Sequence, residues 1–202
     1  MTKKGNLFIV SGPSGSGKDT VLQKVFEHNP DIKFSISTIT RPMRAGETPD
    51  GKYRFVSREK FEDMLKNDEL LEHNVFVGNY YGTPKQYVFD QLKNGYDCIV
   101  EVDVNGAAQI KGKIPDSVSI FICPPSFEVL KKRLSDRGSD SKEAIEKRFN
   151  EALREIKCAS KYDYIVVNDV LDKAVEDVIS IISVQNLKSG NNLSVIDNIV
   201  NI

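Results

Sequence analysis

The sequence has no tryptophan, only three cysteines and two histidines, and almost no net charge. The cysteines (Cys98, Cys123, Cys158) and the histidines (His28, His73) lack the close spacing of a zinc site. An odd number of cysteines, in a chain without an export signal, indicates reduced thiols rather than a disulfide scaffold. A formal net charge of −1 provides no basic field for nucleic acid or for an anionic membrane, so we expect neither as a partner.

Long apolar runs are also missing. No run is long enough to span a bilayer, and the first apolar stretch, residues 6–10, leads into Gly12 and Pro13 rather than into a signal-peptide cleavage site. We therefore expect a cytoplasmic protein. The 202 residues, 40% apolar and 28% charged, suit one globular domain spanning residues 1–202. The sequence leaves a homodimer open.

Short apolar runs alternate with longer amphipathic segments. The predicted strands are 7–10, 97–102, 118–122 and 164–167. The predicted helices are 19–26, 59–66, 85–93, 127–135, 142–158 and 171–187. Strands that alternate with helices form a mainly parallel sheet covered on both faces, so the pattern predicts a three-layer α/β fold.

Two segments depart from this alternation. Residues 35–83 interleave glycine, proline and aromatic residues, which predicts a small mixed α/β insertion that is partly antiparallel. After Leu187, the chain is predicted to form either a short extra helix or a loosely docked tail.

A glycine-rich loop lies between the first predicted strand and the first predicted helix. It comprises Gly12, Pro13, Ser14, Gly15, Ser16, Gly17, Lys18, Asp19 and Thr20. Glycines let backbone N–H groups converge on phosphate oxygens, and the helix start adds partial positive charge. Lys18 is placed to approach the β- and γ-phosphates. The loop is therefore predicted to bind the phosphates of ATP.

Asp19 departs from the usual motif, which has serine or threonine directly after the lysine. A carboxylate beside a triphosphate is repelled unless Mg²⁺ lies between them or the side chain turns away. Ligation of Mg²⁺ by a hydroxyl at this position is lost, so we expect waters and phosphates to hold most of the ion. Asp103, Asp19 and Thr20 stay candidates for a metal contact, direct or through water.

Arginines and hydroxyls follow in residues 37–47. Because the planar guanidinium donates two hydrogen bonds at once, Arg41 and Arg44 are predicted to clamp a second phosphate, with a solvated loop as the alternative. Farther on, the strand at 97–102 ends in acids, and phosphate-loop enzymes often place an acid at such a strand end to hold Mg²⁺ or its waters, with acids facing solvent as the alternative. Asp103 is the first candidate there and Glu101 the second.

Three segments together resemble the guanylate kinase family, bacterial type. They are the glycine loop, residues 40–47 and Gly78-Asn79-Tyr80-Tyr81-Gly82-Thr83, in the order and spacing of that family of nucleoside monophosphate kinases. The resemblance covers about residues 7–169. It implies a P-loop fold with a core (1–34, 84–125 and 150–202), a GMP-binding insertion (35–83) and a helical lid (126–149). It also implies Mg²⁺-dependent transfer of phosphate from ATP to GMP, giving ADP and GDP.

The resemblance further implies residue roles. The phosphate of GMP is assigned to Ser37, Arg41, Arg44, Tyr53 and Tyr81. Guanine is assigned to Glu72 and Thr83, with Asp103 near the base and the metal. The expected catalytic residues are Lys18, Arg41, Arg44, Arg133, Arg137 and Arg148. The adenine ring of ATP is expected beside Asn168.

The chemistry of guanine agrees with two of these assignments. Its N1–H and amino group are donors that suit the carboxylate of Glu72, and its O6 is an acceptor that suits the hydroxyl of Thr83. Adenine presents the opposite pattern and would leave buried groups unpaired. Three alternatives stay open: a kinase for AMP or dTMP, a non-catalytic binding module favoured only by Asp19, and a GTPase switch. The sequence does not contain the Asn-Lys-x-Asp motif with which a GTPase recognises guanine.

Overall fold

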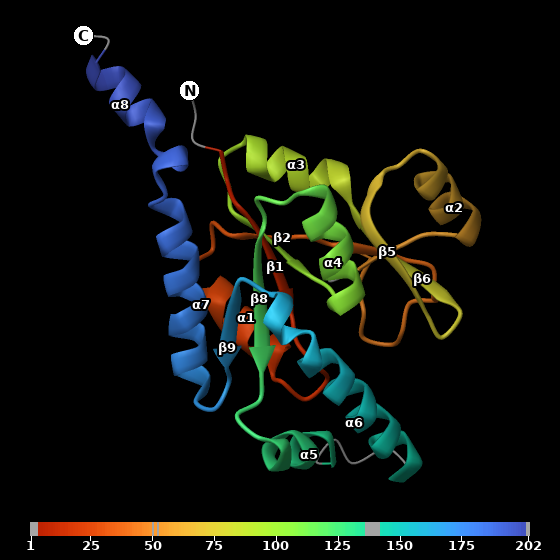
Figure 1. Ribbon diagram of the computed structural model, residues 1–202. Helices are drawn as coiled ribbons and strands as arrows, with labels where there is room; N and C mark the ends of the chain where they lie inside the picture. Colours follow the sequence, from red (N-terminus) through yellow and green to blue (C-terminus); the bar gives the residue numbers. More distant parts are fainter. Residues whose placement is uncertain (1–3, 50, 52, 136–141, 201–202) are drawn as a thin grey trace.

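The computed structural model describes residues 4–49, 51, 53–135 and 142–200. Its centre is a five-stranded parallel sheet in the order β2-β7-β1-β8-β9 (Figure 1). The strands are β1 (Leu7–Ser11), β2 (Lys33–Phe34), β7 (Cys98–Glu101), β8 (Val118–Cys123) and β9 (Tyr164–Val167). The parallel sheet predicted from the apolar runs is therefore confirmed.

Helices cover both faces of this sheet, which makes three layers. They are α1 (Lys18–His28) and α7 (Leu171–Asn186) on one face, and α3 (Lys85–Lys93) and α4 (Val104–Lys113) on the other. Alternate residues of β1 serve the two layers: Phe8 and Val10 join the first cluster, whereas Leu7 and Ile9 join the second. The run of apolar residues in β1 follows from this burial on both faces.

The sequence did not predict α4 or β2. The start of α4 is capped by Asp103, whose Oδ1 accepts hydrogen bonds from the N–H groups of Asn105 and Gly106 at 2.9 and 2.7 Å. Its buried residues include only Gly106, Ala107 and Ile110, so its apolar stripe is too small to give a clear helical period. With two residues, β2 is too short for any periodicity to show.

A second sheet, in the order β4-β3-β6-β5, forms the insertion. Its elements are β3 (Ser37–Ile39), β4 (Tyr53–Phe55), α2 (Arg58–Lys66), β5 (Leu70–Phe76) and β6 (Asn79–Pro84). Strands β3 and β4 run parallel, whereas β6 is antiparallel to both β3 and β5. Phe61 and Met64 of α2 pack with Leu70 in a separate small cluster. The predicted mixed α/β insertion is present.

A helical pair lies beyond the carboxyl end of β8, at the bottom of Figure 1. It consists of α5 (Phe127–Ser135) and α6 (Lys142–Lys157), followed by the 3₁₀ turn η1 (Ala159–Lys161). Leu130 and Leu134 of α5 pack with Ala152 of α6. The rings of Phe127 and Phe149 meet edge to face with centroids 4.5 Å apart.

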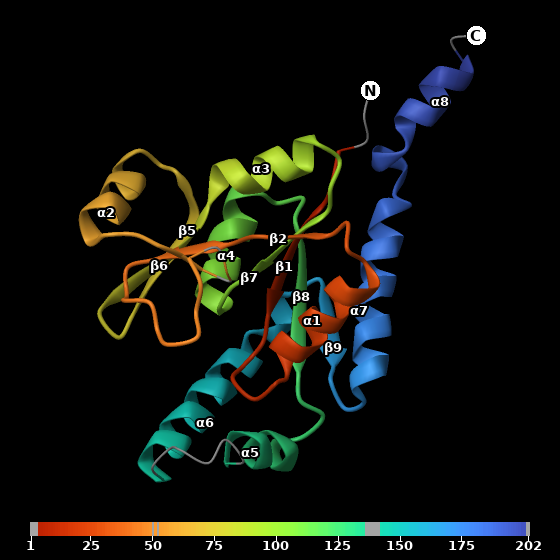
Figure 2. The same ribbon diagram turned by 180° about the vertical axis from the view of Figure 1, so that it is seen from behind.

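The chain after α7 forms a 3₁₀ turn, η2 (Ser189–Asn191), and a short helix, α8 (Leu193–Val200). Of the two alternatives for this segment, the extra helix is correct. Figures 1 and 2 show α8 continuing beyond α7, away from the central sheet. The turn is held to the body by amides, since Asn191 Nδ2 donates to Asn6 Oδ1 at 2.9 Å. No helix in the part of the chain described here combines the length and apolar character needed to cross a membrane.

Replacement of Phe8 by alanine tests the central core. Phe8 is fully buried in β1, so Phe8→Ala is expected to lower the free energy of unfolding by about 3–5 kcal/mol. The matched control is Phe89→Ala on α3, where the side chain is 44% exposed and the loss should stay under about 1 kcal/mol. Urea unfolding measures both. Equal losses would contradict the packing described.

Candidate functional site

The glycine loop lies at the carboxyl edge of the central sheet, between β1 and α1. In open parallel sheets this edge is where ligands bind. All nine loop residues predicted for ATP are there: Gly12 to Gly17 form the loop, and Lys18 to Thr20 form the first turn of α1. The N–H groups at a helix start and the helix dipole both favour an anion at this position.

Two glycines in the loop allow close backbone approach. A β-carbon on Gly12 would lie 2.2 Å from the carbonyl oxygen of Ile122 in β8. Gly17 has a φ of +81°, a left-handed conformation, and a β-carbon there would lie 2.4 Å from Nδ2 of Asn168. A side chain on Gly12 would therefore force the loop away from β8, and one on Gly17 would meet the Asn168 amide in a backbone conformation that side chains rarely adopt.

The lysine of the loop already has a counter-ion. Lys18 Nζ forms a short ion pair with Oε1 of Glu101 at the end of β7. It also lies 3.5 Å from Oδ1 of Asp19, whose side chain is 67% exposed. Asp19 thus points toward solvent beside the lysine. The charge of Lys18 is held at the edge of the sheet, where an incoming phosphate would compete with Glu101.

A cavity of about 370 Å³ lies beside this lysine, between the insertion and the end of β7. Among its lining residues are Ser37, Arg41, Arg44, Tyr53, Glu72, Asn74, Phe76, Tyr81, Glu101, Val102 and Asp103. Seven of the eight residues predicted for GMP are in this set, and the eighth, Thr83, is bonded to Glu72 directly behind it. The structure therefore brings the predicted acceptor residues to one place.

Glu72 and Thr83 form a buried polar pair in this cavity. Thr83 is fully buried, Glu72 is 5% exposed, and Oγ1 of Thr83 donates to Oε1 of Glu72 at 2.7 Å. Burial raises the pKa of Glu72 to about 7, and the charge of Asp103 adds to this rise. The hydrogen bond from Thr83 and the charge of Lys113 oppose it. A carboxyl group in such a position is well placed to accept donors from a planar base.

Arg41 is held in a fork by Glu47. Its NH1 and NH2 donate to the two carboxylate oxygens at 2.7 and 2.5 Å, and the guanidinium lies 5.4 Å from the ring centre of Tyr53. Glu47 also accepts the backbone N–H of Arg44 at 2.7 Å. The Arg41 hydrogen bond lowers the pKa of Glu47 to about 2, so the acid stays ionised and the arginine stays oriented.

Asp103 and Asn74 close one side of the cavity. Besides capping α4, Asp103 accepts a short hydrogen bond from Nδ2 of Asn74 through its Oδ2. Sequence reasoning missed Asn74. The signal that could have found it is the strand period of two, because Glu72, Asn74 and Phe76 share one face of β5 and all line the cavity.

Two of the three predicted lid arginines, Arg133 and Arg148, lie on different helices. Arg133 on α5 donates to the backbone oxygens of Ser16, at 3.4 Å, and Asn168, at 3.0 Å, so it contacts the glycine loop. Arg148 lies on α6. Arg137 falls outside the described residues. Asn168 follows β9, is buried, and its Nδ2 donates to the Ser16 carbonyl at 2.8 Å rather than pointing into open space.

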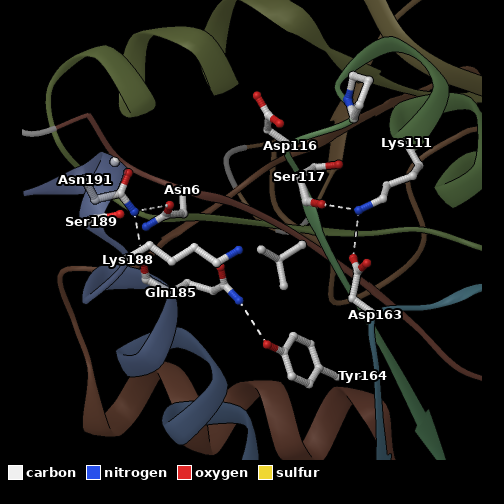
Figure 3. A pocket seen from close by; sticks show the side chains of 13 residues that line it. Asn6, Lys111, Asp116, Ser117, Asp163, Tyr164, Gln185, Lys188, Ser189 and Asn191 are labelled. Carbon is white, nitrogen blue, oxygen red and sulfur yellow. Dashed lines mark hydrogen bonds and ion pairs between the residues drawn. The ribbon is translucent and has the colours of Figure 1, made fainter.

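A larger cavity, of about 770 Å³, lies elsewhere, beside η2 and the start of β8 (Figure 3). Its polar side chains mostly pair with one another: Lys111 with Asp163 at 2.7 Å, and Gln185 with the hydroxyl of Tyr164 at 3.0 Å. The described residues that line it include neither an arginine nor any part of the glycine loop. We therefore assign the nucleotide chemistry to the cavity of about 370 Å³, although the other cavity is larger.

Comparison with known proteins identifies relatives along most of the chain. The family model described as guanylate kinase matches residues 4–185. Two proteins named guanylate kinase, from Oceanobacillus iheyensis and Carboxydothermus hydrogenoformans, are each 46% identical over 92% of this chain and cover 90% and 91% of their own lengths. A crystal structure of guanylate kinase from Anaplasma phagocytophilum matches with a TM-score of 0.75 and 31% identity, over 93% of this chain and 89% of that one.

The raised pKa of Glu72 makes a prediction about stability. In the folded protein the Glu72 carboxyl group keeps its proton up to about pH 7, whereas the ordinary pKa of a glutamate is 4.5. Between these two pH values the folded state therefore binds more protons than the unfolded state. Stability is therefore lost as pH rises through this window. Glu72→Gln removes this titrating group. Relative to the wild type, the free energy of unfolding of the variant should therefore rise by about 2 kcal/mol when the pH is raised from 5 to 8.

Urea unfolding at both pH values measures this gain. The exposed neighbour Glu69 provides the matched control, since Glu69→Gln makes the same chemical change outside the buried pair. A Glu72→Gln effect that does not depend on pH would contradict the burial argument.

Proposed function

This chain belongs to the guanylate kinase family, and we propose that the residues of its two adjoining sites carry out the family's reaction in the roles described here. The reaction is ATP-dependent phosphorylation of GMP to GDP, with ADP as the second product. In this assignment the glycine loop holds the phosphates of ATP, and the arginine-lined cavity holds GMP.

The ion pair between Lys18 and Glu101 is the observation that carries this assignment. Lys18 belongs to the loop, and Glu101 lines the cavity, so the two sites share a wall. A phosphate held by Lys18 therefore faces a phosphate held by Arg41 and Arg44. Such juxtaposition lets the acceptor oxygen attack directly, and alignment of the reactants supplies much of the rate.

Guanine recognition is assigned to the pair Glu72 and Thr83. The N1–H and amino donors of the base favour the ionised form of Glu72, which accepts from them, and the Thr83 hydroxyl turns to donate to O6. Both groups are buried, so a base that cannot pair with them has its own polar groups left without partners, which costs about 1–3 kcal/mol for each such group. This assignment disfavours AMP and dTMP as acceptors. Ser37, Tyr53 and Tyr81 are assigned to the GMP phosphate with the two arginines.

No covalent intermediate is needed for the transfer. The phosphate oxygen of GMP is already a nucleophile, so the protein aligns the reactants and neutralises charge on the moving phosphoryl group. We assign this neutralisation to Lys18, Arg41 and Arg44, and to Arg133, Arg137 and Arg148 from the lid. Charges that approach as the lid closes also exclude water, which strengthens their effect.

We also propose that Mg²⁺ accompanies ATP. No group of three or more acidic, histidine or cysteine side chains suited to a metal forms within residues 4–49, 51, 53–135 and 142–200. The donors near the loop fit an ion held mainly by phosphate oxygens and water, with Asp103, Asp19 or Thr20 contacting it through water. Bound in this way, Mg²⁺ would neutralise charge on the ATP phosphates.

The division of the chain is part of the same proposal. The core comprises residues 1–34, 84–125 and 150–202, the GMP-binding insertion 35–83, and the lid 126–149. A cytoplasmic location is supported by the free cysteines Cys98, Cys123 and Cys158, because reduced thiols are usual in that compartment.

An assay of ADP release tests the proposal most simply. Purified protein with ATP and Mg²⁺ is given GMP, AMP, dTMP or UMP in turn. GMP alone is expected to be turned over efficiently, and chelation of the metal should abolish turnover. Equal rates with AMP would refute the reading of Glu72 and Thr83. Binding of a protein partner without turnover of any acceptor would favour the non-catalytic module.

Arg44 provides a sharper test of the clamp. Its side chain is exposed at the cavity, so Arg44→Met should leave the melting temperature nearly unchanged while lowering kcat/KM for GMP by about a hundredfold or more. The control is Arg54→Met, an exposed arginine of β4 that is not among the cavity residues. Steady-state kinetics and thermal melting are measured together. Unchanged turnover in Arg44→Met would rule out the clamp.

A further inference from the structure

Asn168 makes a contact that a role in binding adenine does not explain. It follows β9 directly, and its backbone N–H donates to the carbonyl of Cys123 at the end of β8 at 2.8 Å. The residue is only 5% exposed. Its side-chain Nδ2 donates across the edge of the sheet to the carbonyl oxygen of Ser16, in the middle of the glycine loop, at 2.8 Å.

The same carbonyl receives a second donor from another element. Arg133 on α5 donates through NH1 to Ser16 O at 3.4 Å, and through NH2 to the backbone oxygen of Asn168 at 3.0 Å. Ser16 is fully buried, so solvent does not compete for these bonds. Three segments that are far apart in the sequence thus meet at a single peptide group of the loop.

That peptide group joins Ser16 to Gly17. A peptide unit is planar and trans, so its carbonyl and its N–H point in opposite directions. A donor that fixes the Ser16 carbonyl therefore also fixes the direction of the Gly17 N–H. Glycine at position 17 is required for this contact, because a β-carbon there would lie 2.4 Å from Nδ2 of Asn168.

We propose that Asn168 is a positioning residue, which holds the Ser16–Gly17 peptide in its phosphate-binding orientation through the bond from Nδ2 to Ser16 O. The ligand that depends on Asn168 is then the triphosphate chain, whichever base it carries. This inference rests on the proposed function, because it takes the loop as the triphosphate site. Arg133 supports the same carbonyl, so helix α5 is coupled to the shape of the loop.

The decisive probe is inorganic tripolyphosphate, which has the phosphate chain of ATP and no base. Asn168→Ala removes the donor, and Asn168→Leu removes it while keeping most of the volume. Calorimetric titration with Mg²⁺ present compares tripolyphosphate and ATP binding to each variant. Both ligands are expected to bind about tenfold more weakly, by the same factor, because the buried Ser16 carbonyl loses its shorter hydrogen bond and keeps only the longer one from Arg133.

Kinetics and controls separate this role from general loss of structure. Asn94→Ala, the same substitution at an exposed helix end, should leave both affinities unchanged. In the Asn168 variants KM for ATP should rise about tenfold, while KM for GMP and calorimetric binding of GMP stay close to the wild type. Loss of GMP binding together with ATP binding would show a general structural role and overturn the proposal.

The remaining outcomes are also decisive. Weaker ATP binding with unchanged tripolyphosphate binding would make Asn168 a contact for adenine and overturn the proposal. Unchanged binding of both ligands by the Asn168 variants would also overturn the proposal. So would a wild-type protein that forms GDP but does not bind tripolyphosphate. Wild-type protein that forms no GDP from ATP and GMP would instead refute the proposed function, whatever the variants do.

Discussion

At Gly12 the backbone of the phosphate loop approaches β8 so closely that a β-carbon would lie 2.2 Å from the Ile122 carbonyl. On its other side the loop is bonded to Asn168 at the end of β9. The ends of two neighbouring strands therefore shape the loop before any ligand arrives. Backbone donors that are already aligned need no reorganisation during the reaction. Such preorganised electrostatic stabilisation is usually the largest single contribution to catalysis.

One cation of each site is paired with an acid of the protein itself. Lys18 is paired with Glu101, and Arg41 is paired with Glu47. These pairs keep like charges from repelling one another across a small cavity, and they hold long side chains in defined positions. Phosphates that enter must compete with the carboxylates or share the cations with them. The lowered pKa of Glu47 means that this competition persists across the physiological pH range.

The sequence allowed much of this site to be predicted. The glycine loop and the apolar strands are local patterns, and the structure confirms the parallel sheet they predicted. The resemblance to guanylate kinases selected Glu72 and Thr83. In the structure Oγ1 of Thr83 lies 2.7 Å from Oε1 of Glu72, although 11 positions separate the two residues in the chain. Neither periodicity nor composition could have paired them.

Other features were not predicted from the sequence, for physical reasons. Helix α4 was not predicted because only three of its residues are buried and two of them, Gly106 and Ala107, are small. Asn74 was not singled out because a single amide in a strand resembles a surface residue, although the strand period of two places it on the same face as Glu72. The contact of Asn168 with Ser16 joins residues 152 positions apart. Such a bond depends on how the strands end in space, and no local pattern encodes that.

The central claim is that a triphosphate site and a GMP site face each other in line. The most direct test is the dissociation constant of a two-ended ligand in which adenosine and guanosine are joined by five phosphates. If both sites are engaged at once, this ligand should bind at least about tenfold more tightly than ATP and should exclude GMP. A two-ended ligand that binds no more tightly than ATP and leaves GMP binding unchanged would contradict the account.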